Sequence, residues 1–265
     1  MPTYRLDLEY DGSRYRGWQE QQNARSITGE LKRAIGDAGG AVVELGGAGR
    51  TDAGVHALHQ VAHLRLKDAV DSRRFRLAIN DALPHDIHVL AMRHASDRFH
   101  ARHDAVLRSY LYQISRRRTA LAKKHVWWIK RSIDLQAIER AARCIPGMHD
   151  FVQFCERPQD QPSTKVLIER TEVATDGALI LVRIVASHFL WKMVRRVVGA
   201  LVKVGASEIT LGDFESLVRG DAVPRLATAA WTAPPSGLFL ERVLYAGDPA
   251  LPPLAATVKV GEERS

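Results

Sequence analysis

Cysteine is scarce in this chain, and its shortage excludes several protein classes. The 265 residues include two cysteines, Cys144 and Cys155, and neither belongs to a CxxC pair. Small secreted domains need several cysteines to form a disulfide framework, and zinc and redox motifs need closely paired ones. We therefore expect both thiols to be reduced and the fold to be held by an apolar core.

Long apolar runs are also missing. Residues 1–10 alternate polar with apolar side chains and lack the apolar centre of a signal peptide. No stretch approaches the roughly 20 apolar residues of a membrane-spanning helix. These absences predict a cytoplasmic protein with no membrane partner.

Charge is the one unusual feature of the composition. Hydrophobic residues make up 46% of the chain, as in ordinary globular proteins, but the formal net charge is +8. This excess favours a polyanionic partner such as nucleic acid. Taken alone, it also fits surface charge that only keeps the protein in solution.

Strand and helix patterns recur in two comparable sets, often with strands following one another directly. In the first set, strands are expected at 4–10, 41–45 and 60–66, and helices at 27–35 and 73–82. In the second set, the expected elements are strands at 108–115, 169–173, 179–186 and 237–245, and helices at 135–145, 190–204 and 211–217. This order predicts an α+β fold with antiparallel sheets covered on one face.

A glycine-rich segment between two expected strands carries the most concentrated chemistry. It reads GRTDAGVH at residues 49–56 and places Arg50 and Asp52 between two glycines. Such a turn can bring its backbone close to a ligand. The local pattern by itself favours a simpler interpretation, in which Asp52 hydrogen-bonds its own turn.

This octapeptide resembles the aspartate motif of the tRNA pseudouridine synthase I (TruA) family, and the resemblance continues in order over residues 3–246. Its further parts are YDGSRYRGWQ at 10–19, Asn80 with Leu83-Pro84, FHAR at 99–102, RSYLY at 108–112, the segment 147–151, MVR at 193–195 and Gly237-Leu238. The chain departs from the family at Lys165-Val166, where many relatives have an arginine, so we assign no function to that segment.

The resemblance implies two ferredoxin-like halves with a joined antiparallel sheet and a catalytic cleft between them. The N-terminal half that carries the aspartate is expected at residues 1–103. The C-terminal half is expected at 104–246, followed by a loosely ordered tail at 247–265. It also implies a homodimer that converts uridine to pseudouridine in the anticodon stem-loop of tRNA, at tRNA positions 38, 39 and 40.

Three residues match catalytic positions of the family. Asp52 corresponds to the carboxylate that acts at the ribose of a flipped-out nucleotide, either as a nucleophile or as a base that generates a glycal. Arg195 corresponds to the cation that orients the carboxylate and keeps it ionised. Tyr110 corresponds to the tyrosine that stacks on the target base. From local pattern alone, Arg195 is a solvated helix flank and Tyr110 a core aromatic.

Binding residues are expected around these three. Arg50 would help to hold the extruded nucleotide, and His56 either positions RNA or completes its own turn. Tyr110 would also contact the substrate. The basic residues from which we expect phosphate contacts are Arg14, Arg16, Arg116, Arg117, Arg118, Lys123, Lys124 and Arg196, of which only part is expected to touch RNA.

Pseudouridine formation involves no net redox change and no hydrolysis, so we expect no cofactor and no metal. Two alternatives remain open from sequence. One is a noncatalytic RNA-binding protein on the same scaffold. The other is a metallohydrolase built on His56, His59 and His63, which the alternation of a strand disfavours because it sends these side chains in different directions.

Overall fold

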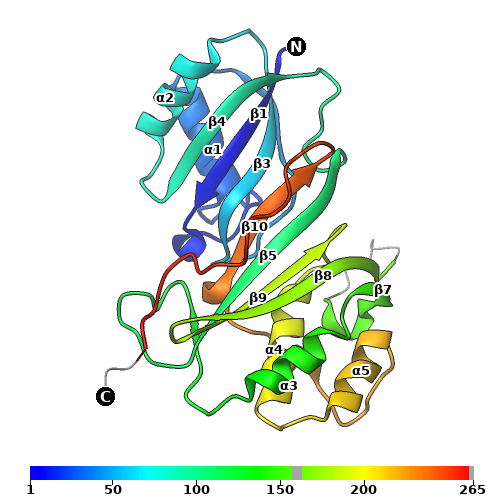
Figure 1. The fold of residues 1–265 in the computed structure, drawn as a ribbon. Coiled ribbons are helices and arrows are strands. Elements are labelled where there is room, and N and C mark those ends of the chain that lie inside the picture. The colour runs from blue at the N-terminus through cyan, green and yellow to red at the C-terminus, as the bar shows by residue number, and fades with distance from the viewer. Residues whose placement is uncertain (157–162, 263–265) are drawn as a thin grey trace. The chain divides into compact units, whose positions relative to one another are not determined.

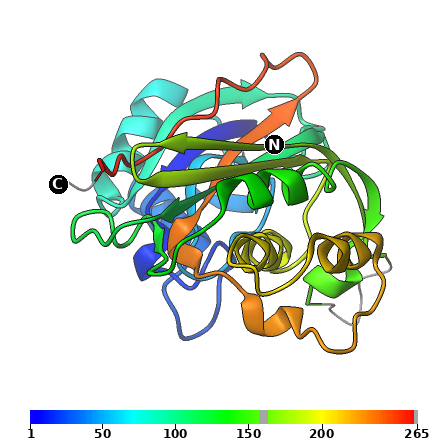
Figure 2. The ribbon, with the colours of Figure 1, turned by 60° about the horizontal axis from the view of Figure 1, so that its bottom comes forward.

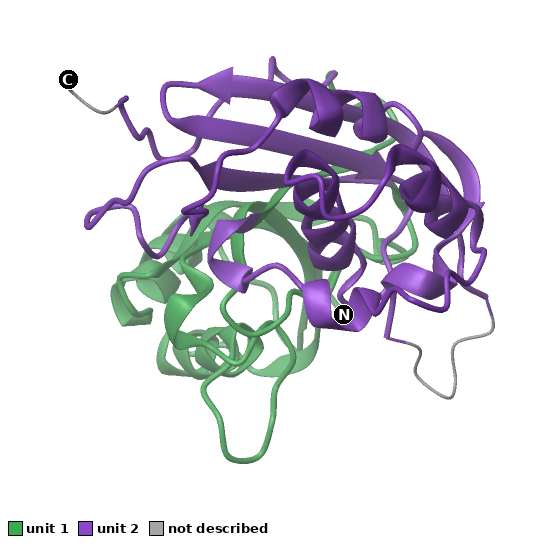
Figure 3. Ribbon diagram, turned by 90° about the horizontal axis from the view of Figure 1, so that it is seen from below, with its two compact units in different colours: residues 1–106, 239–249 green, residues 107–238, 250–265 purple. Residues whose placement is uncertain are grey.

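The structure, a computed structural model, describes residues 1–156 and 163–262. The chain divides into two units, coloured separately in Figure 3: residues 1–106 with 239–249 form unit 1, and residues 107–238 with 250–265 form unit 2. Residues 239–249 belong to unit 1, and the strand that they carry pairs with another strand of that unit. The end of the predicted tail, 263–265, lies outside the described residues.

Unit 1 is an antiparallel sheet with two helices (Figure 1). Its elements in chain order are β1 (Thr3–Tyr10), α1 (Ile27–Asp37), β2 (Val42–Gly47), β3 (His56–Leu66), α2 (Ser72–Ala82), β4 (Ile87–Ala95) and, from the end of the chain, β10 (Leu238–Tyr245). The strand order is β4-β1-β3, and β2 also pairs with β3. β10 runs parallel to the start of β3.

The alternation of β1 explains the core of unit 1. Tyr4, Leu6, Leu8 and Tyr10 are all buried, as the period of two predicts for one face of a strand. Strand β4 was not anticipated from sequence. Its pairing with β1 shifts register after Asp7, and this bulge interrupts the alternation by which a strand is recognised.

Unit 2 combines a set of mostly antiparallel strands with three α-helices. Its elements are β5 (Ala105–Ser115), β6 (Trp127–Trp128), α3 (Leu135–Ala142), β7 (Gly147–Asp150), β8 (Lys165–Asp176), β9 (Leu179–Ala186), α4 (Met193–Gly205) and α5 (Leu211–Arg219). Four strands have the order β5-β9-β8-β7, and β6 is parallel to β5. Figures 1 and 2 show α3, α4 and α5 together on one face of β8 and β9.

The segment after β10 has neither helix nor strand between residues 250 and 262. Its backbone nevertheless makes specific contacts within unit 2. Thr257 N donates to Gln113 Oε1 at 2.6 Å, and the side chain of Arg183 donates to Pro252 O at 3.0 Å. The carbonyl of Val260 accepts from Ala178 N at 2.9 Å.

The molecule as described is a mixed α+β protein whose strands are mostly antiparallel, which confirms the predicted class. Both predicted sets of strands and helices are present in the order expected. Among the described residues, no helix combines the length and the apolar character that crossing a bilayer requires.

Candidate active site

Asp52 lies in unit 1, on the loop that joins β2 to β3, and this loop is bound along its length to a second loop. Trp18 N donates to Thr51 O at 3.0 Å, and Gly54 N donates to Tyr15 O at 3.2 Å. The second loop, residues 11–19, is the YDGSRYRGWQ motif of the sequence. Two motifs separated by about thirty residues in the chain therefore fold as one structure around a half-buried Asp52.

Two glycines make this close approach possible. A Cβ atom on Gly17 would lie 2.4 Å from Thr51 O, and Gly17 has a φ of +95°, a region that other residues rarely adopt. A Cβ atom on Gly12 would lie 1.9 Å from Val55 O. The contacts are with backbone atoms, so a larger residue at either position must move the loop that carries Asp52.

A buried hydrogen bond anchors the aspartate loop to β1. The hydroxyl of Tyr10 lies 2.8 Å from Thr51 Oγ1, next to Asp52 in the chain. Burial raises the pKa of Tyr10 to about 12, although hydrogen bonds with Thr51 and Gln60 act in the opposite direction. Tyr10 therefore stays neutral at physiological pH and serves as an anchor. Gln60 also donates to Gly49 O at 2.9 Å, which fixes the start of the same loop.

His56, at the end of the aspartate loop, is buried in unit 1 and contacts the neighbouring loop at residues 11–19. Its ring is 1% exposed and stacks on Phe239 with centroids 4.7 Å apart. Its Nδ1 accepts from Gly12 N at 3.2 Å and lies 3.1 Å from Asp11 Oδ1. These contacts give His56 a structural function between the two loops, and its contact with RNA remains a prediction.

Tyr110 lies in unit 2, on β5. It is 8% exposed, and its ring meets the ring of Phe189 edge to face at 4.8 Å. Tyr112 follows on the same face of the strand, and its hydroxyl donates to Pro234 O at 2.7 Å. Phe189 belongs to the connection between β9 and α4, so this connection packs directly against the tyrosine face of β5.

Arg195 lies in the first turn of α4 and is tied to the same segment as Tyr112. Its Nε donates to Ala233 O at 2.7 Å, and Ala233 N donates to Arg195 O at 3.1 Å. Burial raises the pKa of Tyr112 well above its usual range, while the positive charge of Arg195 lowers it. Arg195 is thus a charged neighbour of the tyrosine strand, held at a fixed orientation by residues 233 and 234.

The three predicted catalytic residues come from both units. Tyr110 and Arg195 belong to unit 2, where residues 233 and 234 link their strand to their helix. Asp52 belongs to unit 1. The Ala233-Pro234 segment was not predicted to belong to the site. The only feature of the sequence there that stands out is the pair of adjacent prolines.

The predicted RNA contacts differ in exposure. The exposed ones are Arg14, Arg16, Arg50, Arg116, Arg118, Lys123 and Lys124, whereas Arg117 is half-buried. Arg117 Nε donates to Gly261 O at 2.5 Å. Arg196 is 8% exposed, and its guanidinium donates to Cys155 O and lies 3.5 Å from Glu156 Oε2. The structure thus gives Arg196 internal partners that sequence could not show.

The three histidines of the metal alternative have separate surroundings and form no common ligand group among the described residues. His56 lies beside Asp11, and His59 lies 3.9 Å from Asp7. His63 Nε2 lies 3.1 Å from Glu44. A metal site on these three histidines therefore lacks structural support.

A different set, Glu44, His63 and His100, does bring potential ligand atoms within 4.8 Å of one another. However, His63 Nδ1 accepts from Ala101 N at 3.2 Å, and His100 Nδ1 accepts from Arg102 N at 3.2 Å. A neutral ring that accepts at Nδ1 carries its proton at Nε2, the atom that a metal would need. The set is better explained as a hydrogen-bonded cluster, in which the His63 contact holds the pKa of Glu44 below its usual range.

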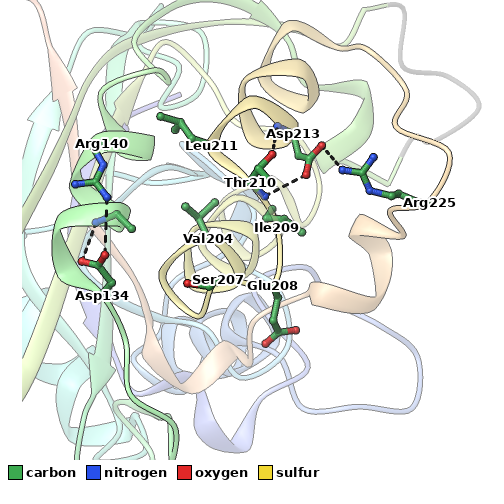
Figure 4. Close-up of a pocket in the computed structure, with 11 residues that line it drawn as sticks. Asp134, Arg140, Val204, Ser207, Glu208, Ile209, Thr210, Leu211, Asp213 and Arg225 are labelled. Carbon is green, nitrogen blue, oxygen red and sulfur yellow. Dashed lines mark hydrogen bonds and ion pairs between the residues drawn. The ribbon is translucent and has the colours of Figure 1, made fainter.

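A cavity of about 420 Å³ lies in unit 2 between α3 and the connection from α4 to α5 (Figure 4). Four of its charged side chains form two ion pairs, in which Arg140 lies 3.8 Å from Asp134 and Arg225 lies 2.5 Å from Asp213, and Glu208 pairs with Lys203. None of the predicted site residues lines it. This cavity is a feature of helix packing and not part of the candidate site.

Comparison with known sequences identifies the class of protein. Residues 8–104 and 141–246 match the family model described as tRNA pseudouridine synthase. These segments include Asp52 and Arg195, whereas Tyr110 lies between them. The class is that of the pseudouridine synthases, which are isomerases.

Curated relatives agree with this class over almost the whole chain. The tRNA pseudouridine synthase A of Afipia carboxidovorans is 40% identical over 248 residues, which cover 92% of this chain and 100% of that protein. Those of Maricaulis maris and Sinorhizobium fredii are 39% and 38% identical and cover 93% and 92% of this chain and 99% and 100% of their own. The chain belongs to the tRNA pseudouridine synthase family.

Proposed function

We propose that this protein converts uridine to pseudouridine within tRNA, with Asp52 as the catalytic carboxylate. The observation that carries the proposal is the loop of residues 49–56. This loop has the family's aspartate motif and is held by backbone hydrogen bonds with the motif at residues 10–19. In the reaction the N1–C1′ bond of uridine breaks and a C5–C1′ bond forms. The proton lost from C5 is balanced by one gained at N1, so no oxidant or cofactor is needed.

The proposed architecture is two ferredoxin-like halves whose sheets join, with the catalytic cleft between them. Unit 1 supports its half directly, because its elements follow the order βαββαβ and its strands the order β4-β1-β3-β2. In the second half, β10 follows α4 and α5 in sequence, as the last strand of another such set would. The proposal requires Asp52 of unit 1 to act on the same nucleotide as Tyr110 and Arg195 of unit 2.

Each of the three residues has a distinct function in this proposal. Asp52 acts at C1′, as a nucleophile or as the base that leads to a glycal, and both routes require it to be ionised. Arg195 supplies the positive charge that keeps the Asp52 carboxylate ionised. The hydrogen bond from its Nε to Ala233 O orients the guanidinium. Tyr110 stacks on the uracil and assists removal of the C5 proton.

The substrate proposed is the anticodon stem-loop of tRNA, at tRNA positions 38, 39 and 40, bound by a homodimer in the cytoplasm. The net charge of +8 and the exposed cations at Arg14, Arg16, Arg50, Arg116 and Arg118 support a polyanionic substrate. Arg50 precedes Asp52 by two residues and is placed to hold the extruded nucleotide, whose release from the stack costs a few kcal/mol.

The decisive experiment is pseudouridine mapping on unmodified tRNA incubated with the protein in the presence of a chelator. The wild type should convert uridine under these conditions. Asp52→Asn keeps the size of the side chain but removes its charge, so its rate should fall by at least about 1000-fold, in the range seen for essential catalytic groups.

The same experiment separates the alternatives. A noncatalytic RNA-binding protein would bind tRNA but leave every uridine unchanged, even as the wild type. A metallohydrolase would lose its activity in chelator. Equal conversion by the wild type and Asp52→Asn would contradict the assignment of Asp52, and tRNA binding measured in parallel shows that the variant is folded.

A further inference from the structure

Trp191 is a large aromatic residue held in solvent. Its side chain is 47% exposed, whereas its neighbours Leu190 and Met193 are 5% and 1% exposed. Tryptophan is highly buried on average, and an exposed ring leaves a large apolar surface in contact with water. Trp191 is thus exposed between two apolar neighbours that are buried.

The backbone holds this ring in place. Glu156 N donates to Trp191 O at 3.0 Å, and Met193 N donates to Leu190 O at 3.1 Å. The next residue, Lys192, adopts a left-handed conformation with a φ of 62°, which is uncommon for a residue with a side chain. The backbone of the turn that carries Trp191 is therefore fixed by these contacts.

A positive charge lies next to the ring. Lys192 Nζ lies 4.9 Å from the centroid of the Trp191 ring and forms an ion pair with Glu156. Arg195 follows one helical turn later. A stacking surface beside cations is the combination that proteins use to bind single-stranded nucleic acid, with the ring contacting a base and the cations contacting phosphates.

The position of Trp191 relates it to the candidate site within unit 2. It lies on the connection between β9 and α4, two residues after Phe189, whose ring contacts Tyr110 at 4.8 Å. It also precedes Arg195 by four residues. A base that stacks on Trp191 would thus be bound beside the segment that positions Tyr110 and Arg195.

We propose that Trp191 is a base-stacking residue that binds an unpaired nucleotide of the RNA next to the target uridine. This inference rests on the proposed function and adds to it a residue that positions the substrate. The exposed ring beside Lys192, on a chain with a net charge of +8, favours a nucleobase as its occupant.

The test uses the full-length protein with Trp191→Ala, Trp191→Phe and a matched control, Leu77→Ala. Leu77 is 49% exposed on α2, where alanine is a favourable helix residue. In Trp191→Ala, the Kd for tRNA and the KM should rise about tenfold, within the range of losing one stacked base, while kcat changes little. Trp191→Phe should recover most of the affinity, because it keeps an aromatic face.

The outcomes separate this inference from the proposed function. An unchanged Kd in Trp191→Ala, or an equal change in Leu77→Ala, would overturn the stacking inference while wild-type conversion of uridine still supports the function. A wild type that binds tRNA without converting uridine would defeat the function alone. A Trp191→Ala variant that dissociates a dimer into monomers in light scattering would show that the ring binds a second copy of the chain instead.

Discussion

The two units hold their candidate catalytic residues in different ways. Unit 1 places Asp52 on a loop, and the loop is fixed by backbone contacts that only glycine permits. Unit 2 places Tyr110 on a strand and Arg195 on a helix, and both elements are fixed by an apolar core. A substitution at Gly17 acts on the backbone of the aspartate loop itself, whereas a substitution at Arg195 or Arg196 changes a side chain on a helix whose backbone stays packed. The two arrangements should therefore respond differently to mutation.

The largest effect is expected in unit 1, from Gly17→Ala. The added methyl group would meet Thr51 O and would also force alanine into a φ of +95°. The aspartate loop must then shift, and a displacement of about 1 Å at a catalytic group costs on the order of 100-fold in rate. Steady-state kinetics of pseudouridine formation, with thermal unfolding recorded in parallel, would measure this loss.

Gly49→Ala is the control for this prediction, since Gly49 belongs to the same loop but a Cβ atom there has no neighbour within 4 Å. Its free energy of unfolding should stay within about 0.5 kcal/mol of the wild type. If Gly17→Ala retained wild-type kcat, the loop would not be fixed by close approach, and the contrast between the units would fail.

Smaller effects are expected in unit 2, from substitutions at two neighbouring arginines of α4. One substitution should lower kcat, and the other should lower stability. Arg195→Lys removes the planar fork that binds a carboxylate and the Nε bond to Ala233, so kcat should fall about tenfold or more with little change in stability. Arg196→Met instead removes the hydrogen bond from this guanidinium to the carbonyl of Cys155, which should lower the free energy of unfolding by about 1–3 kcal/mol.

Denaturant unfolding and kcat per folded molecule separate these two effects. Arg196→Met should keep a kcat near that of the wild type. If it were stable but inactive, Arg196 and not Arg195 would be the residue that α4 contributes to the site.

The smallest effect is expected from pH, at His59 of unit 1. Burial lowers the pKa of His59, and the nearby charges of Arg242 and Arg5 lower it further, against the opposing effect of Asp7. The unfolded chain then binds a proton more readily than the folded one, so stability falls as pH drops below the unfolded value of about 6.5.

The melting temperature should therefore decrease between pH 7.5 and 5.5, and the part due to His59 should be no more than about 3 °C. His59→Gln should show a shallower decrease over the same interval. An identical pH profile in wild type and variant would mean that other groups produce the whole effect, and that this region of unit 1 is insensitive to protonation.

Most secondary structure could be predicted from local sequence because burial follows short periods. The period of two in β1 and the hairpin at Asp176-Gly177 both appear where expected. Strand β4 was missed because its bulge breaks that period, and the pairing of β10 with β3 was missed because it joins segments about 180 residues apart. Neither feature leaves a pattern within a short window.

The sequence by itself determined the family and pointed to Asp52 as the candidate carboxylate, because the glycines, Arg50 and Asp52 all lie within residues 49–56. Only the tertiary structure decided which partners these residues have. It placed His56 against Phe239, gave Arg196 the carbonyl of Cys155, and tied Arg195 and Tyr112 to residues 233 and 234. Such contacts join residues distant in the chain, and their energy depends on burial and geometry that no local pattern records.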